Sequence, residues 1–379
     1  MKSVETIGVI GGGQLGRMFA LDAKRMGYFV LTLDPQEHSP CGQVADEQIV
    51  AGYDDLTAIE ELGRRSDVIT YEFENIDIGS VRHLETLAYR VTPASSVLHV
   101  TQDRLLEKRF ARDTGIPTTE FARVGNAEDL AAAAERIGFP AVLKTVRGGY
   151  DGKGQWQADS LESARAAFDA SSGAELIFEA KVPLACELSV IATRNAGGEI
   201  VTYPVSENFH DRGILTMTIA PARVDERTAD AAREMAGKVG HGLRIVGTYC
   251  VEFFLSTRGE LLLNEIAPRP HNSGHYTIDV TPCSQYEQHV RAICELPLSP
   301  PRLLTNAIMM NVLGTGTGDH LAGVAELLRD PSIVLHVYGK RHAVARRKMG
   351  HFTMLVDGPV DGSAISRAQA AHAKLRWAA

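Results

Sequence analysis

The stretch Ala141-Val142-Leu143-Lys144-Thr145-Val146-Arg147-Gly148-Gly149-Tyr150-Asp151-Gly152-Lys153-Gly154 decides the fold class. Its apolar start, residues 141–143, predicts a strand that ends at Lys144. Four glycines then lie within residues 148–154, so the backbone amides of this loop can close over phosphate oxygens. Lys144 can reach the same phosphates, although the pattern is no P-loop because it lacks Gly-Lys-Ser/Thr. A flexible hairpin with a solvated lysine is the alternative interpretation.

Two carboxylates lie on a second pair of predicted strands, residues 248–255 and 260–266, which a Thr257-Arg258-Gly259 turn connects. Glu252 lies inside the first strand, and Asn264-Glu265 ends the second. A carboxylate in an apolar strand costs free energy unless it is paired or binds a cation. Oxygen ligands of this kind suit magnesium that bridges nucleotide phosphates, whereas salt bridges to arginines are the alternative explanation.

The N-terminus contains a different glycine pattern, Gly11-Gly12-Gly13-Gln14-Leu15-Gly16, which satisfies GxGxxG. It follows a predicted strand, residues 6–10, and opens a predicted helix, residues 14–26. Asp34 ends the next strand, at the position where a dehydrogenase binds ribose. An NAD-dependent oxidoreductase is therefore one candidate class, although no pattern for hydride transfer accompanies the turn. Strands that alternate with helices in this region indicate a parallel sheet.

Composition narrows the class of protein. The 379 residues include 39 Lys plus Arg and 47 Asp plus Glu, and a net charge of −8 argues against a nucleic-acid surface. The five cysteines form no CxxC pair, which predicts reduced thiols rather than a zinc site or disulfide framework. We identify no signal peptide and no apolar stretch of bilayer length, so we expect a cytoplasmic protein that does not enter the membrane.

Lys144, the glycine loop, Glu252 and Asn264-Glu265 together resemble the ATP-grasp superfamily, in which two α/β subdomains hold ATP between them. Further segments are similar to one family in it, the 5-(carboxyamino)imidazole ribonucleotide synthetases of purine biosynthesis. These segments are residues 11–18, 71–76, 102–104, 148–156, 187–189, 207–210, 264–275 and 338–351. The combination is far more specific than any one segment.

The resemblance implies an α/β (α+β) protein of three domains. An N-terminal Rossmann-like, pre-ATP-grasp domain would span residues 1–98, and a small C-terminal domain residues 297–379. The ATP-grasp domain would span residues 99–296, with a mobile lid at about 118–180. Val91-Thr92-Pro93 and the proline-rich residues 297–301 favour these boundaries.

The resemblance also implies an ATP site. Its expected residues are Arg104, Lys144, Gly149, Tyr150, Asp151, Gly152, Lys153, Gly154, Gln155, Glu179, Ala180, Lys181, Val182, Glu187, His210, Asn264 and Glu265. Residues 179–182 would form a strand that reads the adenine edge, and Glu187 would bind the ribose. Glu252 and Glu265 would hold Mg²⁺.

An acceptor site is expected across the cleft from ATP. Its substrate-binding residues by resemblance are Gln14, Leu15, Glu72, Tyr150, Asp151, Lys340 and Arg347. Basic side chains suit a phosphate, although a merely solvated basic run would explain residues 340–348 equally simply. The expected catalytic residues are Asp151, which would guide a proton, Lys153, and Arg269, which would bind bicarbonate or carboxyphosphate.

The implied reaction consumes ATP, bicarbonate and 5-aminoimidazole ribonucleotide in a homodimeric enzyme. ATP would phosphorylate bicarbonate, and the ribonucleotide amine would capture the carboxyl group, directly or as released carbon dioxide. A formate-dependent glycinamide ribonucleotide transformylase is the nearest alternative, because it shares the glycine turn, the metal carboxylates and the basic tail. A nucleotide sensor without catalysis is a third class, but it would tolerate the loss of Glu252 and Glu265.

Overall fold

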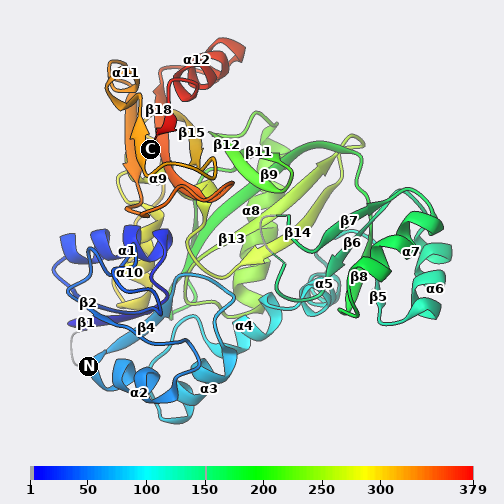
Figure 1. Ribbon diagram of the computed structural model, residues 1–379, viewed down its shortest axis with the longest axis horizontal. Coiled ribbons are helices and arrows are strands. Elements are labelled where there is room, and N and C mark those ends of the chain that lie inside the picture. Colours follow the sequence, from blue (N-terminus) through cyan, green and yellow to red (C-terminus); the bar gives the residue numbers. More distant parts are fainter. Residues whose placement is uncertain (1–3, 150–151, 379) are drawn as a thin grey trace.

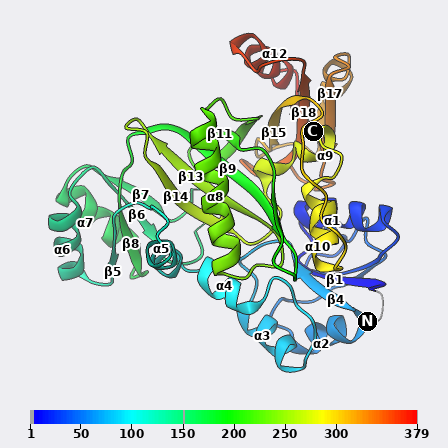
Figure 2. The ribbon, with the colours of Figure 1, turned by 180° about the vertical axis from the view of Figure 1, so that it is seen from behind.

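The computed structural model describes residues 4–149 and 152–378, which form an N-terminal lobe, a central body with C-terminal strands, and a lid (Figures 1 and 2). The N-terminal lobe is a parallel sheet of order β3-β2-β1-β4. Its strands are β1 (Thr6–Ile10), β2 (Phe29–Leu33), β3 (Glu47–Ile49) and β4 (Val68–Tyr71). All these strands pair in parallel, which confirms the parallel sheet predicted from the alternation of short apolar strands with helices.

Helices cover both faces of this sheet. The helices of the lobe are α1 (Gln14–Arg25), α2 (Leu56–Arg65) and α3 (Ile78–Thr86). On one face, Phe19 of α1 packs with Val290 of α10 (Gln285–Ile293), a helix of the central body. On the other face, α2 and α3 bury Leu62 and Leu84 against the strands. The N-terminal lobe is therefore fixed to the central body through α10 (Figure 1).

The central sheet has nine strands in the order β14-β13-β9-β11-β12-β15-β18-β17, with β10 paired to β9. They are β9 (Leu184–Arg194), β10 (Ile200–Thr202), β11 (Ser206–Asp211), β12 (Ile214–Ala220), β13 (Gly247–Ser256), β14 (Leu261–Ala267), β15 (Asn306–Leu313), β17 (Ile333–Val337) and β18 (Lys348–Val356). Helix α8 (Glu226–Gly242) buries alanines and Val239 against β9 and β13. Because β12 pairs with β15, the C-terminal strands continue the central sheet.

The lid is a separate antiparallel sheet of order β5-β8-β6-β7. Its elements are β5 (Phe121–Val124), α6 (Ala127–Ile137), β6 (Ala141–Thr145), β7 (Gln155–Ala158), α7 (Leu161–Ala170) and β8 (Leu176–Ala180). It lies on the side of the body away from the N-terminal lobe, with α5 (Arg104–Asp113) at its base (Figure 1). The remaining short elements are α4 (Ser95–Thr101), η1 (Asn272–Gly274), α9 (Thr277–Val280), β16 (His320–Ala322), α11 (Val324–Leu327), α12 (Gly362–His372) and β19 (Arg376–Ala378).

Helix α5 starts at Arg104, because the Asp103 carboxylate accepts hydrogen bonds from the amides of Leu105 and Leu106 and so caps it. The strand expected over residues 179–182 ends at Ala180. None of the helices in the described ranges is long and apolar enough to cross a membrane.

Candidate functional site

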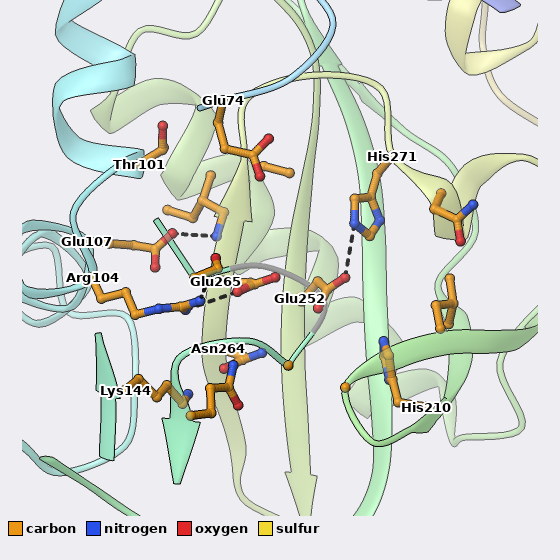
Figure 3. A pocket seen from close by; sticks show the side chains of 18 of the residues that line it. Glu74, Thr101, Arg104, Glu107, Lys144, His210, Glu252, Asn264, Glu265 and His271 are labelled. Atoms are coloured by element: carbon orange, nitrogen blue, oxygen red, sulfur yellow. Dashed lines mark hydrogen bonds and ion pairs between the residues drawn. The ribbon is translucent and has the colours of Figure 1, made fainter. Parts of the chain in front are cut away.

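A cavity of about 440 Å³ lies between the lid, the central sheet and the loop after β4. The predicted residues that line it are Arg104, Lys144, Gly149, Gly152, Gln155, Glu187, His210, Glu252, Asn264, Glu265 and Arg269. They lie far apart in the sequence, from residue 104 to residue 269, and the fold brings them together. Figure 3 shows Arg104 and Lys144 on one side of the two glutamates, and His210 and His271 on the other. Tyr150 and Asp151 lie outside the described residues.

Glu252 of β13 and Glu265 of β14 are direct cross-strand partners. The register shifts next to Glu252, so that Asn264 is an extra residue in β14, a bulge. Burial, followed by the negative charge of Glu265, raises the pKa of Glu252 to about 8. Burial alone would raise the pKa of Glu265 as well, but the nearby Arg104 guanidinium, 3.1 Å away, and Lys144 hold it below its ordinary value.

The oxygen atoms at this bulge fit a hard divalent cation. The buried carboxyl group of Glu252 lies opposite the partly exposed carboxylate of Glu265, so ionisation of both is unfavourable unless a cation binds between them. In addition, the buried Oδ1 of Asn264 has no hydrogen-bond partner within the described ranges. Carboxylate and amide oxygens are the ligands that Mg²⁺ and Ca²⁺ prefer. The donor set of this chain therefore fits the expected metal.

Lys144, which lines the cavity, contacts the buried Glu179. Oε2 of Glu179 is 3.1 Å from Nζ of Lys144, 3.2 Å from Oγ1 of Thr119 and 3.7 Å from Nζ of Lys108. Burial would raise the pKa of Glu179, but Lys108 and then Lys144 lower it to about 2. The other carboxylate oxygen, Oε1, is buried and has no partner in the described part of the chain. A hydrogen-bond donor from a ligand would satisfy it.

Two histidines border the opposite side of the cavity. Nδ1 of His210 lies 2.7 Å from Oε2 of Glu187, and this contact outweighs burial, so the pKa of His210 is raised. Nε2 of His271 lies 3.3 Å from Oε1 of Glu252. Burial and then the charge of Arg269 keep the pKa of His271 well below its ordinary value, so this imidazole is neutral. Glu187 and His210 thus form a polar pair that lines the cavity beside Glu252.

Arg269 is held by the N-terminal lobe. Its Nε lies 2.5 Å from Oε2 of Glu74, and its Nη1 donates to the carbonyl of Pro270. The amide of Gln102 donates to the carbonyls of Glu74 and Ile76, which fixes the loop after β4. Glu74 also lines the cavity, and the sequence-based expectation missed it. The Glu74–Arg269 pair fixes the guanidinium where the N-terminal lobe meets β14 (Figure 3 shows Glu74).

The N-terminal glycine turn does not present a dinucleotide site. The Glu72 carboxylate accepts hydrogen bonds from the amides of Gly13 and Gly16, at the start of α1 where a pyrophosphate would bind. Asp34 accepts from the amide of Gly12, at 2.7 Å, and from the hydroxyl of Tyr53. Both carboxylates therefore already accept hydrogen bonds from groups of the protein itself. This arrangement argues against the oxidoreductase alternative.

Only some of the predicted acceptor residues lie together where the N-terminal turn meets the C-terminal tail. Leu15 and Glu72 line a small space of about 10 Å³. The positive charge of Lys340 favours the ionised form of the Glu72 carboxyl group. Nζ of Lys340 donates to the carbonyl of Lys348, at 2.7 Å. Arg347 is exposed, whereas its neighbour Lys348 lines the main cavity. Gln14 is half-buried at the start of α1.

The remaining predicted ATP-site residues lie around the lid strands. Gly154 accepts a backbone hydrogen bond from Thr145, and Ala180 donates one to Glu120. Lys181 is exposed and donates to the side chain of Gln157, and Val182 is half-buried. Lys153 follows Gly152 in the same loop. Four residues of the site that the sequence did not single out are Glu74, Glu107, Lys108 and Lys348.

Three family models match consecutive parts of the chain. They are a ribonucleotide synthetase preATP-grasp domain over residues 4–102, an ATP-grasp domain over residues 109–286, and a phosphoribosylaminoimidazole carboxylase C-terminal domain over residues 307–360. The first model covers the N-terminal lobe, the second covers the lid and much of the central body, and the third covers C-terminal strands that continue the central sheet. ATP-grasp enzymes use ATP with a divalent metal ion.

Full-length relatives are similar across nearly the whole chain. The N5-carboxyaminoimidazole ribonucleotide synthase of Bacillus subtilis is 45% identical over 92% of this chain and 91% of its own. The enzyme of that name from Brucella melitensis is 44% identical, over 94% and 97%.

Solved structures agree with these relatives. An ADP complex of an N5-carboxyaminoimidazole ribonucleotide synthetase superposes with a TM-score of 0.91 at 44% identity, over 98% of both chains. The Aspergillus clavatus synthase in complex with ADP and 5-aminoimidazole ribonucleotide also gives a TM-score of 0.91, at 30% identity over 99% of both chains.

Proposed function

Because this chain belongs to the N5-carboxyaminoimidazole ribonucleotide synthase family, we propose that it carboxylates 5-aminoimidazole ribonucleotide with ATP and bicarbonate. The products are N5-carboxyaminoimidazole ribonucleotide, ADP and phosphate. One observation supports this most directly: Glu252 opposes Glu265 in the same cavity that Arg104 and Lys144 line. Such an arrangement suits phosphoryl transfer, in which positioning and charge neutralisation provide most of the catalysis.

Within this proposal, Mg²⁺ is held by Glu252 and Glu265, with Asn264 beside them. When bound, the ion neutralises charge on the phosphates of ATP. Arg104 and Lys144 bind the same phosphates from the lid side, and the glycine loop, residues 149–155, covers them. The unpartnered Oε1 of Glu179 accepts from the adenine amino group, and residues 180–182 offer backbone groups to the adenine edge.

Glu187, paired with His210, binds the ribose of ATP. Arg269, oriented by Glu74, binds bicarbonate next to the terminal phosphate, since a guanidinium pairs well with planar oxyanions. A bicarbonate oxygen attacks the γ-phosphorus, the bond to ADP breaks, and carboxyphosphate forms. The Lys153 ammonium and Arg104 stabilise the charge that develops on the transferred group.

The ribonucleotide amine then attacks the carboxyl carbon, phosphate leaves, and the amine gives up a proton to Asp151. Gln14, Leu15, Glu72 and Tyr150 contact the ribonucleotide, and Lys340 and Arg347 bind its phosphate. The charge of Lys340 already acts on Glu72, which supports a common site for the two. Exclusion of water by the lid protects carboxyphosphate from hydrolysis.

The same proposal includes a homodimer in the cytoplasm and three domains, residues 1–98, 99–296 and 297–379. The formate-dependent alternative differs in the carboxylate that ATP activates. The relatives named above favour bicarbonate.

ADP release is the experiment that tests the proposed function. We expect ADP release only when ATP, bicarbonate and 5-aminoimidazole ribonucleotide are all present. Formate in place of bicarbonate should give no ADP release. Glu265→Ala should lower the rate on the order of a hundredfold, because the metal loses a direct ligand. ADP release that is unchanged after omission of both bicarbonate and the ribonucleotide would refute the reaction. Glu260→Ala, on the exposed turn before β14, is the matched control.

A further inference from the structure

Helix α5 presents three charged residues to the metal-binding strand. Arg104, Glu107 and Lys108 have the spacing i, i+3, i+4, which places them on one face of the helix. Arg104 contacts Glu265 directly. Glu107 and Lys108 are almost fully buried, with 2% and 1% of their surface exposed, which is rare for charged side chains. Their contacts go to the backbone of β14.

These two side chains bind the backbone on either side of Asn264-Glu265. Nζ of Lys108 donates to the carbonyl of Leu263, at 3.0 Å. Oε1 of Glu107 accepts from the amide of Ile266, at 2.5 Å (Figure 3). The first group belongs to the peptide plane before Asn264, and the second to the plane after Glu265. Both planes that flank the dipeptide are therefore fixed by consecutive residues of one helix.

Strand β14 needs this support because of its place in the sheet. It is the last strand of the sheet, with β13 on one side; on the other side the described residues add only an isolated bridge between Leu263 and Thr118, in which the Leu263 amide donates to the carbonyl of Pro117. The extra residue Asn264 interrupts the ladder where the metal ligands lie, and a bulge leaves backbone groups without ladder partners. Thr118 adds to the same contact, since its hydroxyl donates to the carbonyl of Leu263 at 2.8 Å and accepts from Lys108.

We propose that Glu107 and Lys108 are positioning residues that clamp the backbone of β14 and so set the geometry of the metal ligand Glu265 and of Asn264 beside it. This inference rests on the proposed function, which makes Asn264-Glu265 part of the cation site. The clamp acts through backbone hydrogen bonds. A glutamine at 107 can replace the glutamate, because its amide oxygen also accepts from Ile266.

Binding of Mn²⁺ to the ADP-bound protein, followed by the loss of the free-ion electron paramagnetic resonance signal, tests the clamp without turnover. We expect Glu107→Leu and Lys108→Met each to weaken Mn²⁺ binding about tenfold, as removal of outer supports of a metal site does. Glu107→Gln should bind Mn²⁺ as tightly as the unsubstituted protein, because its side chain still accepts from the amide of Ile266. Arg109→Met, the exposed neighbour on α5, is the matched control and should bind normally.

The clamp is overturned if Glu107→Leu and Lys108→Met bind Mn²⁺ normally, or if Glu107→Gln binds as weakly as Glu107→Leu. If Glu107→Leu or Lys108→Met prevents folding, Thr118→Val is measured instead, because valine has nearly the same shape as threonine. It should weaken Mn²⁺ binding about threefold, and Thr118→Ser should restore it; normal binding by Thr118→Val would then overturn the clamp. A failure of the proposed function would be seen differently. The unsubstituted protein would then bind Mn²⁺ but would not carboxylate the ribonucleotide.

Discussion

Glu179 uses one carboxylate oxygen for Lys144, 3.1 Å away, while its other oxygen is buried and has no partner within the described residues. A buried acceptor without a hydrogen bond is costly, so this oxygen indicates where a ligand donor is expected. The adenine ring presents an amino group there in the proposed function, whereas guanine would present a carbonyl. The buried lysines keep Glu179 ionised, which makes the discrimination electrostatic as well.

Glu179→Ala should therefore reduce the preference for ATP over GTP by about tenfold, because the amine of adenine loses its acceptor. The measurement is kcat/KM for both nucleotides. Glu175→Ala, an exposed glutamate just before β8, serves as the control and should keep the original preference. An unaltered ratio in Glu179→Ala would contradict the assignment.

Metal affinity should depend on pH through Glu252. Its pKa of about 8 lies above the ordinary value of 4.5, so the folded protein without metal holds a proton there that the unfolded chain releases. The contribution of Glu252 to stability therefore falls as pH rises from 4.5 to about 8. Mg²⁺ must displace this proton, so its affinity should increase between pH 6 and 8 and level off above.

Titration calorimetry of Mg²⁺ with ADP at several pH values measures this dependence. The uptake of metal should release a proton at pH 7 in the original protein and none from this site in Glu252→Gln, which should also bind more weakly. An affinity that is constant from pH 6 to 8 would contradict a protonated Glu252.

Acid should destabilise the junction of the N-terminal lobe through His289. Its Nε2 lies 2.9 Å from the hydroxyl of Thr70, its Nδ1 accepts from the amide of Thr248, and burial lowers its pKa to about 3. The unfolded chain takes up this proton at its ordinary pKa of 6.5. The contribution of His289 to stability is thus complete above pH 6.5 and is lost as pH falls toward 3.

Between pH 6 and 4 the slope of unfolding free energy from this one group should approach about 1.4 kcal/mol per pH unit. Denaturant unfolding at each pH measures it. His289→Gln should lower the slope of unfolding free energy against pH by the amount that corresponds to about one proton. His38→Gln, at an exposed position, should leave this slope unchanged. Equal slopes in the two variants would disprove the assignment.

Gly13 should be intolerant of a side chain. A Cβ atom at this position would lie 2.3 Å from Oε1 of Glu72, the carboxylate that caps α1. Gly13→Ala must displace Glu72, so we expect KM for 5-aminoimidazole ribonucleotide to rise about tenfold with KM for ATP nearly constant. Gly237→Ala, where the Cβ meets nothing within 4 Å, is the control. A normal KM for the ribonucleotide in Gly13→Ala would remove Glu72 from the acceptor site.

Much of the fold could be predicted because its patterns are local. The strand at residues 6–10 agrees with the structure to the residue, and the hairpin of β13 and β14 was expected with its glutamates. Apolar runs bounded by Gly, Asp and Pro are sufficient for such assignments. The convergence of Lys144, Glu252 and Glu265 on one cavity is confirmed.

The contacts that were missed connect segments far apart in the sequence. Glu107 and Lys108 belong to a highly charged helix, and adjacent opposite charges on a helix are usually solvated. Only the packing of α5 against β14 buries them. Glu74 pairs with Arg269 across 195 positions of sequence, and no local pattern reveals such a partner. Lys348 reaches the cavity because β18 joins the central sheet, which charge alone did not indicate.

The pairing of β12 with β15 has a consequence for truncation. Residues 217–220 of β12 are matched to residues 307–310 of β15, so β15 covers what would otherwise be an edge of the sheet. A protein shortened before β15 would present unpaired backbone donors and acceptors flanked by Ile219 and Met217. Such a fragment would aggregate by strand addition, so the ATP-grasp part of this chain is not an excisable module.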